Sequence, residues 1–404
     1  MKKFILAAFI LYLPFQLRLS QVVSLNIVNL FLIFLLLLFI FSRKSNSIKS
    51  KFETSLLIFL LIWIFSFLHT LFLGIEIWQW EITKEFKRLF TLVLGYFVFS
   101  RCVTTKKDLH FLFYTFLISI ILVGLHVWRN GMLAGMHFAD FKRSSGPFGI
   151  GWEGSDIAGG FLAVFTPFLL STTLLARKKI LKSLGSFGLI ICFLGIFATY
   201  SRGSMLALGI ASIITILIAA KYFLKTSKFT AVVILFIFVV LAFNWQRWVP
   251  QSILNRIEGT VQEETYGGES KLDISSQKRI GAWRTSLAIF KMNPIIGVGF
   301  KVPEYTLSYD AHNTFIQILA EMGIVGFLAF LWFLWGVFRE TASLLNTEFN
   351  YLRIGFIGCI IAFIIVNMFY SNFFRDTVVG TFWIALGMLA ASKKFAVKTN
   401  QLKK

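Results

Sequence analysis

Long apolar runs constrain this chain more than any other feature of its sequence. Several of them reach the length of about 20 residues that a helix needs to cross a bilayer. Of the 404 residues, 57% are hydrophobic, and the mean hydropathy is +0.77. A soluble protein of this length could not bury so much apolar surface. The pattern predicts an all-α polytopic membrane protein in which residues 1–404 form a single integral membrane domain.

We predict twelve spans, and this even number places both ends of the chain on the same side of the membrane. The spans cover residues 4–19, 22–42, 54–73, 88–104, 109–127, 157–176, 184–200, 204–221, 229–245, 313–338, 352–370 and 377–392.

The distribution of lysine and arginine predicts the orientation. With both termini in the cytoplasm, the inner segments carry 23 of these residues and the short outer segments carry nine. Cytoplasmic loops are the ones that accumulate positive charge. The remaining eight lie in residues 246–312, which are too long a loop for the rule to count. We therefore expect cytoplasmic termini and one large outer loop at 246–312.

The net charge of +21 has this topological explanation, so we do not expect a nucleic-acid partner. Cys102, Cys192 and Cys359 provide neither a disulfide framework nor the spacing of metal ligands. The sequence also lacks a glycine-rich nucleotide loop, a His/Cys metal set and an Asp-x-Asp pair. A metal-independent mechanism that uses cationic side chains fits this sequence best, and we expect no cofactor.

Arg202 lies in "TYSRGS", the whole predicted outer connection between two spans. The simple explanation is an arginine that contacts lipid phosphate. An outward-facing arginine in so short a turn opposes the usual charge bias, however, and serves no topological purpose. We therefore favour a functional role for Arg202.

The long outer loop contains a predicted helix that ends at Asn293–Pro294. Its apolar residues recur at i, i+3, i+7 and i+10, which places them on one face. This face is expected to point toward the helix bundle and consists of Ile280, Trp283, Leu287 and Phe290.

Two arginines of this helix are candidate phosphate ligands, because a guanidinium group binds phosphate through two parallel hydrogen bonds. Arg279 and Arg284 are five positions apart, which separates them by about 140° around the helix axis. At most one of them can point straight into a site. We favour Arg279, which lies nearer the apolar face, and keep Arg284 in reserve.

Lys87 and Arg88 lie where the predicted span 88–104 begins on the outer side. Positive side chains at this level are commonly interfacial anchors. Phosphate binding is the functional alternative that we carry forward for both.

His312 is the only histidine predicted in a polar outer segment directly before a span. It could be an ordinary residue at a helix start, capped by Asp310 or Asn313. An imidazole titrates near neutral pH, however, which makes it a natural general base. Glu321 lies about 180° around the helix from His312, so we do not expect it to orient the ring. A structural hydrogen bond within the bundle is the favoured role for Glu321.

Four stretches together resemble the O-antigen ligase/O-antigen polymerase superfamily of bacterial envelope glycosyltransferases. The resemblance extends over about residues 80–390 and is specific in combination. The stretches are "GSDIAGGFLAVFTPFLL" (154–170), "SRGS" (201–204), "KRIGAWRTSLAIFKMNPIIGVGF" (278–300) and "HNTFIQILAEMGIVGFLAF" (312–330).

The resemblance implies a type C glycosyltransferase architecture in the bacterial inner (cytoplasmic) membrane, with the active site in the periplasm. It implies an undecaprenyl diphosphate-linked glycan as donor and a lipid-anchored or glycan acceptor. His312 would be the catalytic base, and Arg202 and Arg279 would bind the diphosphate. We expect the substrate-binding residues to be Lys87, Arg88, Arg284 and Asn313.

Three functions stay open at this point. Transfer to a lipid A-core sugar would make the protein a ligase, which we slightly favour, and transfer to a second glycan would make it a polymerase. A transporter of an anionic solute is the alternative from another class, with Glu321 as the main feature in its favour. A purely structural assembly partner is the third possibility.

Overall fold

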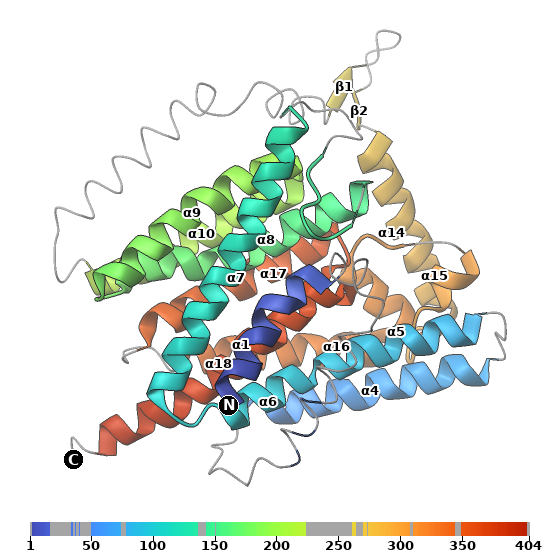
Figure 1. Cartoon of the computed structure of the whole chain (residues 1–404). Helices are drawn as coiled ribbons and strands as arrows, with labels where there is room; N and C mark the ends of the chain where they lie inside the picture. Colours follow the sequence, from blue (N-terminus) through green and yellow to red (C-terminus); the bar gives the residue numbers. More distant parts are fainter. Residues whose placement is uncertain are drawn as a thin grey trace. The chain divides into compact units, whose positions relative to one another are not determined.

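The computed structural model describes residues 2–16, 34, 37, 40, 50–73, 78–135, 143–149, 151–223, 261–263, 270–272, 274–307, 310–343 and 349–401 (Figure 1). The chain divides into two compact units. Unit 1 comprises Met1–Phe116, Arg279–Phe349 and Val366–Lys404, and unit 2 comprises Leu117–Lys278 and Asn350–Ile365.

Eight of the described helices are long and apolar enough to cross a membrane, and they confirm eight of the twelve predicted spans. They are α4 (Glu53–Phe72), α7 (Lys106–Leu133), α8 (Gly151–Leu175), α9 (Lys179–Thr199), α10 (Arg202–Phe223), α16 (Thr314–Ser343), α17 (Asn350–Phe369) and α18 (Asp376–Gln401).

The four other predicted spans have different outcomes. Most of 22–42 and all of 229–245 lie outside the described residues. The described part of 4–19 forms α1 (Lys2–Tyr12) and the 3₁₀ turn η1 (Leu13–Phe15). The predicted span 88–104 is two shorter helices, α5 (Gln79–Leu92) and α6 (Leu94–Cys102).

Val93 separates α5 from α6, although its own dihedral angles are helical (φ −60°, ψ −27°). The Thr91 hydroxyl donates to the backbone carbonyl oxygens of Lys87 and Arg88, at 2.7 and 3.0 Å. Such back-bonding competes with the helical ladder and bends helices.

Unit 1 is built around aromatic side chains. The helix pairs α16–α4 and α18–α6 pack together, and α18 also contacts α5. Trp63 of α4 is fully buried and lies next to Phe300 and Phe373, with ring centroids 6.1 and 5.7 Å away. Phe373 belongs to the 3₁₀ turn η3 (Asn372–Phe374), which connects α17 to α18. This aromatic core therefore joins α4 to the segment before α16 and to the turn that follows α17.

In unit 2, α8 packs against both α9 and α10 through small residues. A β-carbon at Gly159 of α8 would lie 2.7 Å from the Ser204 hydroxyl of α10. At Gly188 of α9 it would lie 2.7 Å from Ile121 Cδ1 of α7. Membrane helices commonly use small residues to approach closely, because lipid offers no hydrophobic driving force between them.

The described part of the long loop contains a two-stranded hairpin and two helices. Strands β1 (Val261–Glu263) and β2 (Ser270–Leu272) pair antiparallel, with Gln262 opposite Lys271. Helices α14 (Ile274–Met292) and α15 (Val302–Leu307) follow. The end of α14 confirms the predicted stop at Asn293–Pro294.

The predicted buried face of α14 is wrong in detail. Its buried residues are Ala282, Ser286 and Ile289, whereas the side chain of Leu287, placed on the predicted inner face, is 39% exposed. The i, i+4, i+7 spacing of these three residues makes one face of the helix. The spacing of the large apolar residues therefore predicted the helix correctly. The buried face of the helix lies beside the one that this spacing predicted.

Helix α16 is broken at Gly323, whose φ of 65° and ψ of −167° are not helical. The segment 294–299 runs beside the break and supplies the missing hydrogen bonds in both directions. Its amides donate to carbonyl oxygens before the break, and its carbonyl oxygens accept from amides after it. The four bonds are Val298 N to Ala320 O (2.9 Å), Gly299 N to Glu321 O (3.0 Å), Ile324 N to Pro294 O (2.9 Å) and Val325 N to Ile295 O (3.3 Å).

We call residues 294–300 and 320–325 together the clasp. Glycines permit its close backbone approach, because Gly297 and Gly323 both have positive φ. A β-carbon at Gly297 would collide with the Glu321 carbonyl group, and one at Gly323 would collide with that of Ile295. The Ser66 hydroxyl of α4 also donates to the Glu321 carbonyl oxygen, at 2.9 Å. The clasp thus satisfies backbone groups that would cost several kcal/mol each if left unpaired in a bilayer.

Candidate functional site

His312 lies in a tight turn directly before α16. Its φ is +48°, a left-handed conformation that few residues other than glycine adopt. Its backbone N–H donates to Asp310 Oδ1 at 2.8 Å. The next residue, Asn313, caps the helix, because its Oδ1 accepts from the amides of Phe315 and Ile316 at 2.9 and 3.1 Å. Asn313 Nδ2 donates to the Met368 carbonyl oxygen at 3.1 Å, so both ends of the Asn313 amide contact the fold.

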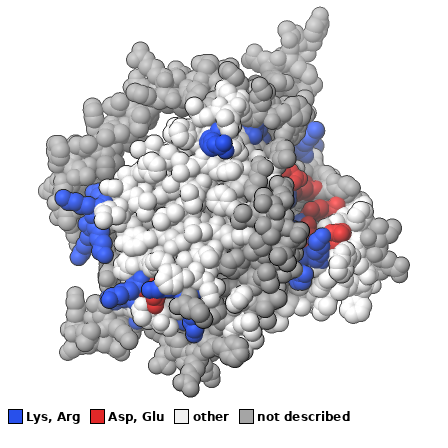
Figure 2. All heavy atoms as spheres, viewed as in Figure 1, with Lys and Arg blue, Asp and Glu red and all other residues white. Residues whose placement is uncertain are grey.

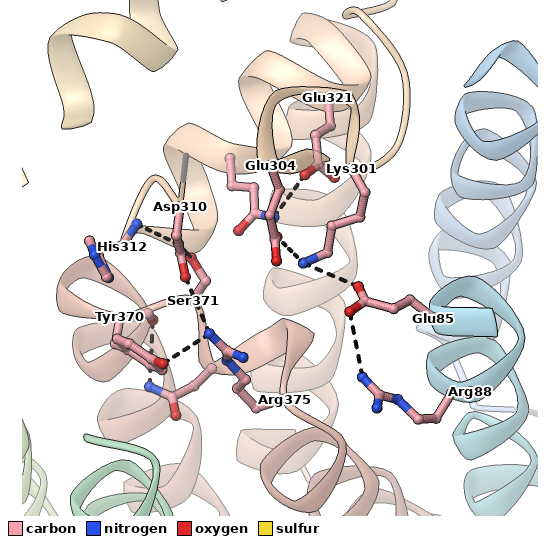
Figure 3. A network of polar contacts seen from close by, with 12 residues as sticks. Glu85, Arg88, Lys301, Glu304, Asp310, His312, Glu321, Tyr370, Ser371 and Arg375 are labelled. Carbon is pink, nitrogen blue, oxygen red and sulfur yellow. Dashed lines mark hydrogen bonds and ion pairs between the residues drawn. The ribbon is translucent and has the colours of Figure 1, made fainter. Parts of the chain in front are cut away.

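The two nitrogens of the His312 ring have different surroundings. Nδ1 is buried and has no hydrogen-bond partner among the described residues. The residue as a whole is half-buried, and because Nδ1 is enclosed we assign Nε2 as the nitrogen that would contact a substrate. The ring lies beside Tyr370, with centroids 5.7 Å apart and planes tilted by 30° (Figure 3). The imidazole is therefore packed beside Tyr370 with its Nδ1 enclosed.

Asp310 connects the His312 turn to the start of α18. Its Oδ1 accepts from the Ser371 hydroxyl at 3.2 Å, and its Oδ2 lies 3.2 Å from Arg375 Nη2. Burial alone would raise the pKa of Asp310. The charges of His312 and Arg375 and the hydrogen bond from the His312 amide outweigh burial, so the pKa lies below its usual range. Asp310 is therefore an ionised acceptor at neutral pH.

Arg375 completes this group. Its Nη2 donates to the Tyr370 hydroxyl at 2.9 Å, and its guanidinium lies 5.1 Å from the centroid of the same ring. In the sequence, Arg375 is one of the nine lysines and arginines in the short outer segments. Nothing in the sequence connects it to Asp310.

A second charged group lies around Lys301, which is 5% exposed and has a positive φ of 60°. Its ammonium group pairs with Glu304 of α15 and with Glu85 of α5, the latter at 3.4 Å. Burial alone would lower the pKa of Lys301. Glu304, Glu85 and Glu321 outweigh this effect, so its pKa lies above the usual range. Figure 2 shows acidic and basic side chains in one patch where Figure 1 draws α5 and α15.

Glu321 does not orient His312, as expected from its position on the helix. One carboxylate oxygen accepts from Gln317 Nε2 at 2.7 Å, which confirms the structural hydrogen bond. Its other carboxylate oxygen is buried without a hydrogen-bond partner among the described residues.

The remaining residues predicted in unit 1 differ in their surroundings. Arg88 Nε lies 2.7 Å from Asp376 Oδ2, so its charge is balanced within the fold. Lys87 and Arg284 are exposed, and Arg279 is half-buried, three residues before the buried Ala282. These exposures agree with the preference for Arg279 over Arg284. A substrate role for any of the four stays a prediction.

Arg202 is the first residue of α10 and belongs to unit 2, whereas Arg279 and His312 belong to unit 1. The connection to α9 is as short as predicted, and Tyr200 within it has a left-handed φ of 51°. Arg143 holds this turn: its Nε donates to the Thr199 carbonyl oxygen at 2.8 Å, and its Nη2 lies 2.7 Å from Asp156 Oδ1. Arg143, in the connection between α7 and α8, thus supplies an anchor for the Arg202 turn.

Within the parts of the chain that the structure describes, no three His, Cys, Asp or Glu side chains are arranged to hold a metal ion. The chemistry that these residues can provide is proton transfer at His312 and binding of anions by guanidinium groups.

The model of the family described as O-antigen ligase matches residues 187–331, which confirms the resemblance seen in the sequence. The matched region begins in α9, ends in α16 and includes Arg202, Arg279 and His312, but it is shorter than the predicted 80–390. No curated protein matches the chain.

Proposed function

We propose, from the match of residues 187–331 to the O-antigen ligase family, that this membrane protein transfers a glycan from undecaprenyl diphosphate to an acceptor hydroxyl. The reaction would take place at the periplasmic face of the bacterial inner membrane. A lipid A-core sugar is the favoured acceptor, which makes the protein a ligase. A second glycan as acceptor would make it a polymerase of the same superfamily.

The observation that carries this proposal is the state of His312. A left-handed backbone at a non-glycine residue costs about 1–3 kcal/mol, and such strain is concentrated at functional sites. Here it accompanies a half-buried ring whose Nδ1 is enclosed and which packs beside Tyr370. An ordinary helix-start residue needs neither feature, since Asn313 already provides the cap.

In the proposed reaction, His312 Nε2 takes the proton from the acceptor hydroxyl. The acceptor oxygen forms a bond to the anomeric carbon of the glycan, and the bond from that carbon to the diphosphate oxygen breaks. The electron pair leaves with undecaprenyl diphosphate, whose growing charge is stabilised by Arg202 and Arg279. Arg284, Lys87 and Arg88 are further candidates for contact with the anionic donor, and Asn313 for contact with the substrate beside the base.

The direct test is replacement of His312 by Ala in the purified protein. Transfer is measured with the lipid-linked glycan that accumulates in cells lacking this chain. We expect a loss of 10²-fold or more in kcat, which is within the range that general base catalysis supplies (about 10²–10⁴). His110→Ala is the matched control, because His110 bonds to the Lys106 carbonyl oxygen within α7. Unchanged turnover in His312→Ala would remove His312 as the base.

The same deletion cells separate a ligase from a polymerase. Long glycan that stays on undecaprenyl diphosphate indicates a missing ligase. Single repeat units on the same carrier indicate a missing polymerase.

One observation favours the transporter alternative, because transporters commonly use discontinuous helices and α16 is broken at Gly323. In a transporter the freed backbone groups face the solute or ion. Here the carbonyl oxygens of Ala320 and Glu321 already accept hydrogen bonds from Val298 and Gly299. This pairing supports a structural break over an ion site. Solute uptake into liposomes without any glycan product would reverse that preference.

A further inference from the structure

We propose that Asp310 is a positioning residue for His312, acting on the backbone of the base and not on its ring. The inference rests on the proposed function only for the chemistry that His312 performs. The placement of the ring can be tested without that chemistry.

Four residues, one of them His312 itself, form a closed set of contacts (Figure 3). The His312 amide donates to Asp310, and Asp310 binds Arg375. Arg375 donates to the Tyr370 hydroxyl and lies over the Tyr370 ring. The Tyr370 ring lies beside the His312 ring. Each member is therefore held from two sides, and the loop before α16 is joined to the segment that connects α17 to α18.

Asp310 reaches His312 through the backbone alone. Its Oδ1 accepts the His312 amide at 2.8 Å, and the buried Nδ1 of the ring has no hydrogen-bond partner among the described residues. The arrangement therefore differs from a triad, in which the carboxylate binds the imidazole N–H. An acceptor two residues earlier in the chain stabilises a turn of this kind, as aspartate does in Asx turns.

The charge of Asp310 is needed for the other half of its role. Its carboxylate binds Arg375 through Oδ2 and the Ser371 hydroxyl through Oδ1. Asparagine at this position could still accept the His312 amide, but it could not pair with the guanidinium. Alanine would remove both contacts. The two substitutions therefore divide the function of the side chain into a turn-forming part and an anchoring part.

The expected consequence of a displaced base is a lower kcat. A misplacement of about 1 Å can reduce the rate about 10²-fold, because the reacting groups no longer meet. We expect such a loss for Asp310→Ala, with KM for the lipid-linked donor little changed, and a smaller loss for Asp310→Asn. A side chain that served only to fold the protein would reduce the amount of active enzyme and leave the kcat of the folded fraction unchanged.

The experiment uses the full-length purified protein and two readouts. The first is kcat and KM with the lipid-linked glycan from cells lacking this chain. The second is the rate at which diethyl pyrocarbonate modifies His312, followed by mass spectrometry of its peptide. We expect His312 to be modified faster in Asp310→Ala than in the wild type, because the freed ring exposes both nitrogens. Glu81→Ala is the control, since Glu81 is a surface carboxylate of the same unit, 46% exposed.

The outcomes are distinguishable. If kcat and the His312 modification rate are both unchanged in Asp310→Ala, the positioning role is wrong, whatever His312 does. If His312→Ala retains transfer while the modification rate changes in Asp310→Ala, the proposed function of His312 fails and the positioning stands. Should Asp310→Ala fail to fold, Asp310→Asn provides both readouts, and an unchanged kcat and modification rate there would overturn the anchoring role.

Discussion

Lys301 illustrates how a single residue holds several segments of unit 1 together. Its ammonium group pairs with Glu304 of α15 and Glu85 of α5, and it lies 5.5 Å from the centroid of the Phe374 ring. It also directly follows the clasp in the chain. Removing one partner of a buried ion pair lowers the stability more than replacing both partners by apolar residues. The remaining charge is then left uncompensated.

We therefore expect Lys301→Met to destabilise the protein by about 3–5 kcal/mol, the range found for broken buried pairs. The measurement is thermal unfolding in detergent, followed by size-exclusion chromatography. Lys84→Met is the control: Lys84 is 62% exposed and lies 3.8 Å from Glu81, so its loss should have a small effect. Equal melting temperatures for the two variants would contradict the buried pairing.

The pKa of Lys301 is raised, which fixes the direction of its pH dependence. Its contribution to stability is fully present below the unfolded pKa of about 10.4 and is lost as the pH rises through the folded pKa. The difference in melting temperature between wild type and Lys301→Met should therefore be constant through neutral pH and shrink only in strong alkali.

At the scale of elements, the clasp is the feature that joins the segment 294–300 to the break in α16. Its four backbone hydrogen bonds join the residues around Gly323 to a loop segment 22 to 30 residues earlier in the chain. The broken helix is therefore a product of tertiary contacts, and the glycines at 297 and 323 permit it.

Gly323→Ala should disrupt the clasp, because its β-carbon would collide with the Ile295 carbonyl oxygen and φ is positive there. We expect a clear fall in melting temperature and a loss of transfer. Gly281→Ala is the matched control, since a β-carbon there meets nothing within 4 Å on α14. That change should raise stability slightly, because alanine favours helix over glycine by about 1 kcal/mol. A Gly323→Ala protein as stable as Gly281→Ala would show that the close approach is dispensable.

The Arg202 turn gives a second prediction for a local element. Arg143→Ala removes the donor to the Thr199 carbonyl oxygen and leaves Asp156 without its guanidinium partner. If the turn places Arg202 against the diphosphate, the variant should bind undecaprenyl diphosphate several-fold more weakly. The control is Arg129→Ala, an exposed arginine of α7 in the same unit. Equal dissociation constants for Arg143→Ala and wild type would show that the contacts of Arg143 do not contribute to donor binding.

The elements of this fold were predictable to different degrees, for physical reasons. Hydropathy located eight spans, because burial in lipid needs a run of apolar residues of fixed length. The end of α14 followed from Asn293–Pro294. The break in α16 could not be predicted, because Gly323 lies within an apolar run that reads as continuous helix. The partners of the His312 turn, Tyr370 and Arg375, were missed because no local pattern connects residues 60 positions apart.

At the scale of the whole molecule, the charge distribution predicts where each connection lies. Lysine and arginine favour the cytoplasmic side, which places the α8–α9 connection inside and α14 outside. This orientation also decides whether His312 and Arg279 face the periplasm, where a lipid-linked glycan would be transferred.

The orientation can be measured with single cysteines in a Cys102→Ser background, because Cys192 and Cys359 are buried. Lys278→Cys on α14 should react with a membrane-impermeant maleimide added to intact spheroplasts. Lys178→Cys, between α8 and α9, should react only after the membrane is permeabilised. Both positions are exposed, so accessibility within the fold does not limit the comparison. The reverse labelling pattern would place the proposed site on the cytoplasmic side.

The clasp has one more consequence, which concerns rotational register. In an uninterrupted helix, one inserted residue rotates everything beyond it by about 100° around the axis. In α16 the direction of the chain is reset at Gly323, and the half that begins at Thr314 is fixed by its own bonds to the loop. Insertions in the half after Gly323 should therefore leave the direction of His312 unchanged. The half of α16 after Gly323 is therefore expected to tolerate a change of length without turning the proposed base away from the proposed substrate.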